Sequence, residues 1–117
     1  MDMQLTKKAN IVLEDLDCGE GNSSKIQDVF AQPQGAPFTF GVFELQKSKG
    51  VEFDYDNDAA CCYLLEGEIT LTENLSGEAV KFEPGDIVYI PQKAGLVVTW
   101  TTDAYAKFVF VTYPHWR

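Results

Sequence analysis

The chain has 117 residues, of which 45% are hydrophobic and 13% aromatic, so it can pack one domain but is too short for two. Nine basic residues against eighteen acidic ones give a formal net charge of −9 at pH 7. This charge repels phosphate backbones and anionic membrane surfaces, so we expect neither nucleic acid nor a membrane as a partner. No stretch has the pattern of a signal peptide or the length of a membrane span, and the sequence predicts a cytoplasmic protein.

The first third of the chain, residues 1–37, is the least regular part, and we interpret it as an arm and loop that wrap the rest of the domain or a partner subunit. Within it, 9–13 is expected as an edge strand and 14–24 as a loop. Residues 25–30 are a strand or a turn. Two prolines in 32–37 remove backbone donors and break the chain before the regular part begins.

The next part alternates β patterns with turns. Residues 38–45 are β-rich with apolar side chains at both odd and even positions, which predicts a strand covered on two faces. Residues 47–50 are expected to form a turn. The run 51–65 contains Asp54, Asp56 and Asp58, whose side chains share one strand face if the run stays extended.

The stretch 63–91 has the clearest strand and turn signals. Residues 69–72 and 79–83 both alternate apolar and polar side chains, and 73–77 between them holds turn formers and a glycine, so an antiparallel hairpin is predicted. Pro84-Gly85-Asp86 predicts a second tight turn in which the aspartate accepts local backbone N–H groups. The apolar run 87–90 is then expected to be a strand with two buried faces.

The last third adds two more strands. Residues 92–95 form a turn into 96–102, where Leu96, Val98 and Trp100 share one face, and 105–113 closes the domain. About ten short strands without a clear helix predict an all-β sandwich or barrel, folded as a single domain.

Three short motifs resemble the core of the cupin superfamily in order and spacing: Leu65-Glu66-Gly67-Glu68, Glu83-Pro84-Gly85-Asp86 and Tyr89-Ile90-Pro91. The resemblance implies a double-stranded β-helix, the cupin jelly-roll barrel, for residues 38–117. The ending Val111-Thr-Tyr-Pro-His-Trp116 is also similar to the tail of small cupins that resemble the ethanolamine-utilisation Q protein. That similarity implies a place in a catabolic pathway.

The same resemblance locates the positions where cupins usually bind a metal. Counting back from Gly67 puts the paired histidines at Asp54 and Asp56, or at Phe53 and Tyr55, and the glutamate at Ala60; the later histidine falls at Leu96. Alanine and leucine offer no ligand atom for a transition metal. We therefore expect the fold without a metal or other cofactor, and we read the three aspartates as structural or surface residues, because the spacing of a calcium loop is not completed after them.

Other polar residues give no decisive catalytic pattern. Cys61 and Cys62 are neighbours whose side chains leave a strand on opposite faces, and Cys18 lies far away, which favours reduced thiols packed as small hydrophobic side chains. The only histidine, His115, is interpreted as a tail residue that caps backbone groups. An acid or base would have to come from Tyr55, Lys93 or the aspartates.

Three classes of function remain open. The first is a metal-free small-molecule binding or accessory protein, with a small amine or amino alcohol as the expected ligand, because carboxylates pair with a cation and a tryptophan face attracts it. The second is a metal-independent enzyme, isomerase-like or hydrolytic, and the third is a structural dimer. In all three cases we expect a homodimer, because strands that are apolar on both faces must be covered on both. The ligand-binding candidates are Asp54, Tyr55, Asp56, Asp58, Cys62, Tyr89, Trp100, Phe108 and Phe110.

Overall fold

The computed structural model describes residues 2–117 apart from the side chain of Lys47, so Met1 of the expected arm lies outside the described residues. The helical segments are two single 3₁₀ turns, and none in the described chain is long and apolar enough to cross a membrane. The strands are β1 (Glu14–Leu16), β2 (Ser23–Phe30), β3 (Thr39–Asp54), β4 (Ala59–Gly67), β5 (Ile69–Glu73), β6 (Ala79–Phe82), β7 (Ile87–Ile90), β8 (Val97–Thr102) and β9 (Ala106–Tyr113).

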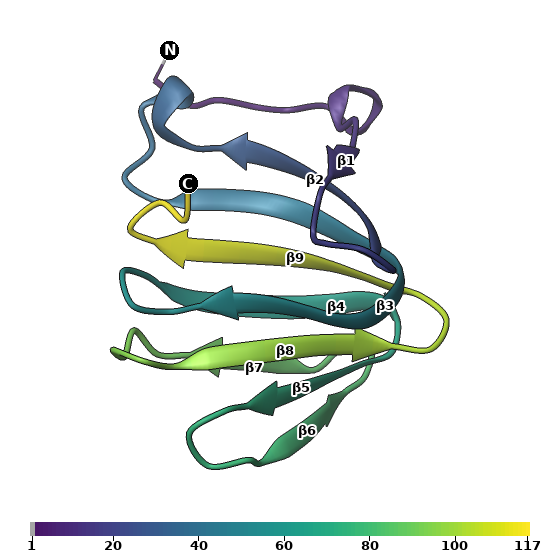
Figure 1. The fold of residues 1–117 in the computed structure, drawn as a ribbon. Coiled ribbons are helices and arrows are strands. Elements are labelled where there is room, and N and C mark those ends of the chain that lie inside the picture. Colours follow the sequence, from purple (N-terminus) through teal and green to yellow (C-terminus); the bar gives the residue numbers. More distant parts are fainter. Residues whose placement is uncertain (1) are drawn as a thin grey trace.

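These strands form two antiparallel sheets that face each other (Figure 1). Sheet A has the order β1-β2-β3-β9-β4-β7, and sheet B has the order β3-β8-β5-β6. Long β3 belongs to both, because its first half pairs with β2 and β9 and its second half with β8. The predicted all-β, single-domain jelly roll is confirmed.

The turn predicted at 47–50 is wrong, because β3 passes through these residues as one strand. Its pairing with β8 shifts register between Ser48 and Val51, where Gly50 has a φ of +143°. The Ser48 hydroxyl donates to the backbone carbonyl of Trp100 at 2.8 Å and accepts from the Gly50 N–H at 3.0 Å. The turn-forming residues therefore build a bulge that redirects β3 from sheet A to sheet B.

The extended run expected from Asp54 to Cys62 is also wrong, since β3 ends at Asp54 and β4 begins at Ala59. Between them, the Tyr55 N–H donates to the Leu96 carbonyl at 2.9 Å and the Tyr55 carbonyl accepts from the Lys93 N–H at 3.0 Å. These bonds tie the loop 55–58 to the turn before β8. The three aspartates consequently do not share one face.

The predicted hairpin is confirmed, with Ile69 opposite Phe82 and Leu71 opposite Val80. The turn at 84–86 is confirmed as well. Gly85 has a φ of +91°, and the Asp86 carboxylate accepts the Glu83 N–H at 2.9 Å. The expectation of two buried faces fails for β7: Ile87 and Tyr89 are exposed because β7 is the last strand of sheet A and nothing in the described chain covers its outer face.

The N-terminal residues differ from the expectation in detail. Residues 9–13 are not a strand; a 3₁₀ turn (Lys8–Asn10) lies there, and β1 falls in the stretch interpreted as a loop. β2 pairs with β3, Ile26 lying opposite Phe43, and so belongs to sheet A. A second 3₁₀ turn (Gln32–Gln34) then leads into β3 at the prolines.

Among the glycines, Gly67 at the end of β4 has the least room for a side chain. Its φ is +82°, and a Cβ added there would collide with the Tyr105 carbonyl oxygen. We expect Gly67→Ala to lower the free energy of unfolding by about 3 kcal/mol or more, from backbone strain and the clash together.

Urea unfolding of Gly67→Ala beside Gly77→Ala checks this prediction. Gly77 also has a positive φ, +72°, but its added Cβ would meet nothing within 4 Å, so the control should lose only about 1 kcal/mol. Equal losses in the two variants would show that the close approach to Tyr105 does not limit the fold.

Candidate functional site

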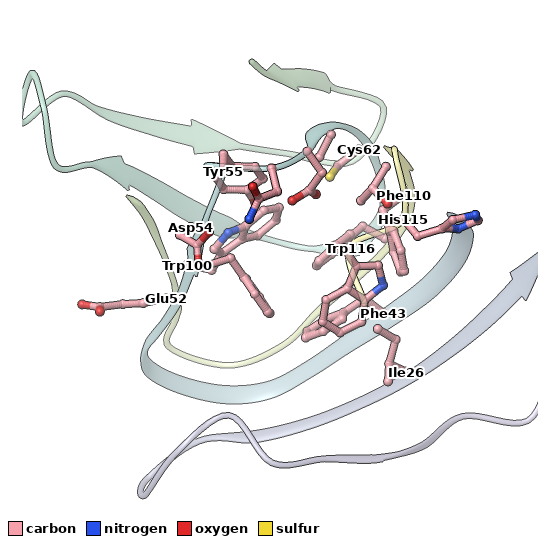
Figure 2. Close-up of a pocket in the computed structure, with 16 residues that line it drawn as sticks. Ile26, Phe43, Glu52, Asp54, Tyr55, Cys62, Trp100, Phe110, His115 and Trp116 are labelled. Atoms are coloured by element: carbon pink, nitrogen blue, oxygen red, sulfur yellow. The ribbon is translucent and has the colours of Figure 1, made fainter. Parts of the chain in front are cut away.

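A cavity of about 370 Å³ opens between the two sheets, on the side where β3 and β9 face the loop 55–58 (Figure 2). Inner-face side chains of both sheets form its walls, and the C-terminal residues form part of its rim. Its lining consists of Ile26, Phe43, Glu52, Phe53, Asp54, Tyr55, Asn57, Asp58, Ala60, Cys62, Trp100, Phe108, Phe110, Thr112, His115 and Trp116.

Aromatic rings make up most of the apolar wall. Phe108 stacks between Phe43 and Trp100, with centroids 5.2 Å and 5.0 Å away and ring planes inclined by 20° and 17°. Phe53 meets Phe43, Trp100 and Trp116 edge to face at 6.0 to 6.5 Å. Such pairs hold one another in place, so the wall presents fixed aromatic faces and edges to whatever enters.

Asp58 is the buried carboxylate among the residues that line this cavity. It is 8% exposed, and none of the hydrogen bonds among residues 2–117 involves its side chain. Burial and, to a smaller extent, the negative charge of Asp54 raise the pKa of Asp58 from 3.8 to about 6. An ionised Asp58 at neutral pH therefore has no partner among the described residues, while its oxygens, which are not among the inaccessible unpaired atoms, stay open to a cation or a donor in the cavity.

Tyr55 and Cys62, which also line the wall, stay neutral at neutral pH. Burial raises the pKa of the Tyr55 phenol far above its usual range, and nearby negative charges act in the same direction. Burial also raises the pKa of the Cys62 thiol to about 12, with a smaller contribution from Cys61. Because a thiol with this pKa is almost wholly protonated at neutral pH, Cys62 is an inert hydrophobic side chain and not a nucleophile.

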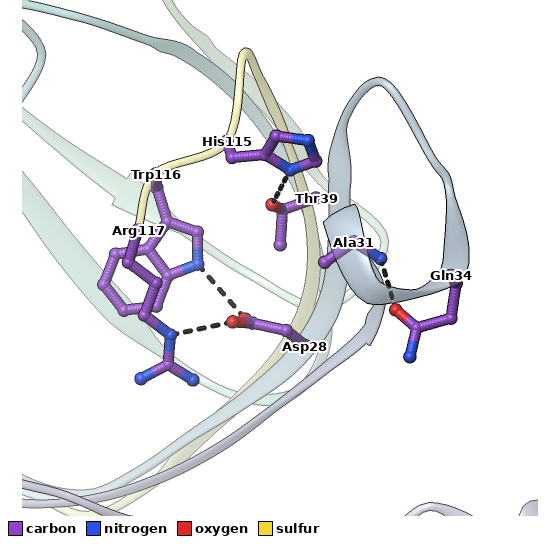
Figure 3. A network of polar contacts seen from close by, with 7 residues as sticks. All are labelled: Asp28, Ala31, Gln34, Thr39, His115, Trp116 and Arg117. Carbon is purple, nitrogen blue, oxygen red and sulfur yellow. Dashed lines mark hydrogen bonds and ion pairs between the residues drawn. The ribbon is translucent and has the colours of Figure 1, made fainter.

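The C-terminal residues are held against the rim by a small polar network (Figure 3). The Asp28 carboxylate on β2 accepts from Trp116 Nε1 at 3.1 Å and from Arg117 Nε at 2.7 Å, and the guanidinium lies 4.6 Å from the Trp116 ring centroid. His115 Nδ1 shares a hydrogen bond of 2.8 Å with the hydroxyl of buried Thr39. His115 thus binds a side chain, whereas the sequence interpretation had it capping backbone groups.

The structure brings most of the predicted candidates to this cavity and leaves two outside. Asp56 is exposed, and its Oδ1 accepts the Gly95 N–H at 2.7 Å, because the loop turns it away from the cavity. Tyr89 lies on the outer face of sheet A. The candidates that do line the cavity are Asp54, Tyr55, Asp58, Cys62, Trp100, Phe108 and Phe110.

Sequence reasoning missed several lining residues for two reasons. Phe43 and Phe53 lie on one strand, β3, which the sequence interpretation divided at 47–50. Thr112 at the end of β9 and Trp116 beyond it lie within 111–116, where similarity to small cupins was the available signal but gave no orientation. Parity along an uninterrupted β3 would have placed Phe43 and Phe53 on the inner face.

The residues at the usual metal positions do not fit a metal. Ala60 and Leu96 are buried and carry no ligand atom, and among residues 2–117 no three His, Cys, Asp or Glu side chains gather as metal ligands would. The groups that the site offers a ligand are its carboxylates, aromatic rings and hydroxyls.

Comparison with known proteins identifies the fold family. No curated protein matches the chain. The family model of the EutQ-like cupin domain matches residues 33–108. A putative ethanolamine utilization protein Q from Salmonella typhimurium LT2 superposes with a TM-score of 0.82 at 18% identity, covering 97% of this chain and 87% of that one. The Clostridium difficile EutQ protein gives 0.80 at 20% identity with 97% and 88% coverage, and ectoine synthase from P. lautus gives 0.75 at 18% with 97% and 79%. The chain belongs to the EutQ-like cupin family.

Proposed function

We propose that this protein binds a small organic amine in the cavity between its sheets. The observation that carries the proposal is Asp58, a buried carboxylate without a hydrogen-bond partner in the described chain, set beside stacked aromatic rings. An ammonium group would pair with Asp58, while the ligand's apolar part would pack against Trp100 and Phe108. Attraction of a cation to an aromatic face adds roughly 0.5–2 kcal/mol.

The charge distribution favours an amine over an acid. The lining includes Glu52, Asp54 and Asp58, and of the basic side chains in the described chain only His115 reaches it. Glu52 points away from the cavity in Figure 2 and Asp54 is exposed, so the buried Asp58 supplies the inner charge. The overall charge of −9 attracts cations and repels phosphorylated or carboxylated molecules.

Calorimetric titration of tag-free protein tests the proposal, with small primary amines set against carboxylic acids of the same carbon skeleton. Amines should bind with a measurable heat and acids should not. Elemental analysis of the same sample establishes that no transition metal is responsible. If neither set of compounds binds, or if the acids bind more tightly than the amines, the proposal is wrong.

Similarity to the two EutQ proteins supports a role for the bound amine in catabolism, either as a compound sensed or as one carried to an enzyme. We place the protein in the cytoplasm, where the thiols of Cys18, Cys61 and Cys62, all free here, stay reduced.

A metal-independent enzyme is the second candidate, and the pKa of Asp58 favours it. A carboxyl group with a pKa of about 6 both accepts and donates protons near neutral pH. Lys93, considered from the sequence as an acid or base, does not line the cavity. Deuterium exchange at the carbon next to the carbonyl of a bound amino ketone, followed by mass spectrometry in deuterated water and faster with the protein than without it, separates an enzyme from a binding protein.

We also propose a homodimer through the outer face of sheet A. Five large apolar side chains expose 41% to 72% of their surface there. Together they expose on the order of 500 Å² of apolar surface. A stable dimer buries about 800 Å² of surface on each partner, so these side chains could supply most of such an interface. A second copy suits this face because a two-fold axis would place the same apolar side chains against one another. The side chains are Tyr63, Leu65, Ile87, Tyr89 and Tyr113.

Light scattering at micromolar concentration is expected to give twice the chain mass of 13.1 kDa. Ile87→Lys with Tyr89→Glu should convert the protein to a monomer, while Val80→Lys on exposed β6 of sheet B should leave the dimer intact. A monomer for the unmodified protein would contradict the proposal.

A further inference from the structure

Two segments outside the strands line the cavity, the loop 55–58 and the segment 114–117, and they are fastened to the fold in different ways. The loop is fixed by two backbone hydrogen bonds of Tyr55, at 2.9 Å and 3.0 Å, and by the bond from the Gly95 N–H to Asp56. The segment 114–117 follows the end of β9, and no backbone–backbone hydrogen bond joins it to the rest of residues 2–117. It can therefore move without breaking the sheet.

Side-chain contacts hold the segment 114–117 in place, and most of them meet at Asp28 (Figure 3). This carboxylate on β2 accepts from Trp116 Nε1 at 3.1 Å and from Arg117 Nε at 2.7 Å, while His115 is joined to the Thr39 hydroxyl at 2.8 Å. The Asp28 side chain is 17% exposed and the Arg117 side chain 46%. An ion pair with so exposed a partner contributes little to stability, so this fastening opens more easily than the ladder of a sheet.

The ring that Asp28 holds is part of the cavity wall. Trp116 is partly buried, packs against the core and meets Phe53 edge to face, with ring centroids 6.0 Å apart. Because this wall residue belongs to the weakly fastened segment, an outward movement of its ring would widen the opening of the cavity while the loop 55–58 stays in place.

We infer that the segment 114–117 is a gate on the cavity, in which the Trp116 ring is the moving part and Asp28 is the positioning residue that keeps it closed. Small molecules enter and leave when the ring moves outward. The inference concerns access to the cavity, so it does not depend on the proposed amine.

The two tryptophans of the chain allow a direct test, because Trp116 lies on the gate and Trp100 on the strand wall behind it. Each can be observed alone by acrylamide quenching of its fluorescence, Trp116 in a Trp100→Phe protein and Trp100 in a Trp116→Phe protein, where the phenyl ring still fills the gate. Added to each protein, Asp28→Ala should raise the quenching constant about twofold or more. Trp116 becomes accessible because its ring leaves the wall, and Trp100 because acrylamide then enters the cavity.

Two further variants serve as controls. Asp15→Ala removes an exposed carboxylate from β1, away from the cavity lining, and should leave both quenching constants unchanged. Arg117→Gln keeps the bond from Trp116 to Asp28, so it should give a smaller rise for both tryptophans, and it carries the test if Asp28→Ala does not fold. Circular dichroism reports whether each variant is folded.

The quenching of Trp100 distinguishes a gate from a segment that is merely anchored beside the cavity. A rise for Trp116 alone would overturn the inference, because the cavity would then be no more accessible with the segment released. No rise for either tryptophan would overturn it as well, because Asp28 would not hold the ring. A rise for both supports the gate.

Discussion

Asp58→Asn is expected to lower the affinity for small amines about 100-fold at pH 8. The substitution keeps the size of the side chain and removes the charge that pairs with the ammonium group. A charge-assisted hydrogen bond in a buried position is worth about 1.5–3 kcal/mol, and 2.7 kcal/mol corresponds to the 100-fold loss. Calorimetric titration of both proteins with the same amine measures it.

The affinity for amines should depend on pH, because Asp58 pairs with the ammonium group only when it is ionised. Asp58 has a pKa of about 6 in the folded protein, so below pH 6 a proton competes with the amine and the affinity should fall about tenfold per pH unit. Above pH 7 the affinity should be constant while the amine stays protonated. The Asn variant should show no such fall between pH 5 and 7.

Stability of the ligand-free protein should change in the opposite sense. The folded state raises the pKa of Asp58 above its ordinary 3.8, so the folded protein binds this proton more tightly than the unfolded chain. The stabilising effect is therefore complete below about pH 4 and is lost as the pH rises through 6. Asp58→Asn should raise the melting temperature at pH 8 and leave it unchanged at pH 4.

Asp56→Asn is the matched control, since Asp56 lies two residues away, is exposed and does not line the cavity. The Asn side-chain oxygen can still accept the Gly95 N–H, so the loop should stay intact. If Asp56→Asn weakens amine binding as much as Asp58→Asn, general electrostatic attraction rather than a specific pair at Asp58 accounts for the affinity.

The sequence predicts the fold well where turn chemistry is local. Glycine at positive φ and an aspartate that accepts nearby N–H groups define the turn at 84–86, and period-2 alternation sets the β5–β6 register. Prediction from the sequence fails at 47–50, because Ser48 and Gly50 form a bulge as readily as a turn. Only the pairing of the second half of β3 with β8, a contact between distant segments, decides between these outcomes.

The site could be predicted only in part, namely where its residues lie on regular strands. Trp100, Phe108 and Phe110 alternate on strands whose inner face is evident from parity, and all three line the cavity. Asp56 and Asp58 follow the end of β3, where parity no longer applies, and bonds to the distant turn 93–96 decide which one enters. Asp28 gave no signal, because its role depends on the C-terminal residues that it binds.

Trp100→Ala is expected to lower the free energy of unfolding by about 3–5 kcal/mol, the usual range for removing a large aromatic side chain from a core. Trp100 is 3% exposed and lies between the stacked Phe108 ring and the edge of Phe53. Its removal would leave Phe108 without one stacking partner and connect the cavity with the core around Leu71. The lower end of the range applies, because the unpaired Nε1–H is removed as well, and leaving such a group buried is unfavourable.

Urea unfolding should rank three variants by what each removes. Trp100→Phe keeps a stacked ring and loses the unpaired donor, so it should cost less than about 1.5 kcal/mol. Trp116→Ala removes a half-buried ring and the hydrogen bond to Asp28, and should cost about 1–2 kcal/mol. If Trp100→Ala lowered the free energy of unfolding no more than Trp116→Ala does, the stacked rings of Phe43, Phe108 and Trp100 would contribute little to the core. The expected gap of at least 1 kcal/mol would instead show that Trp100 belongs to the core.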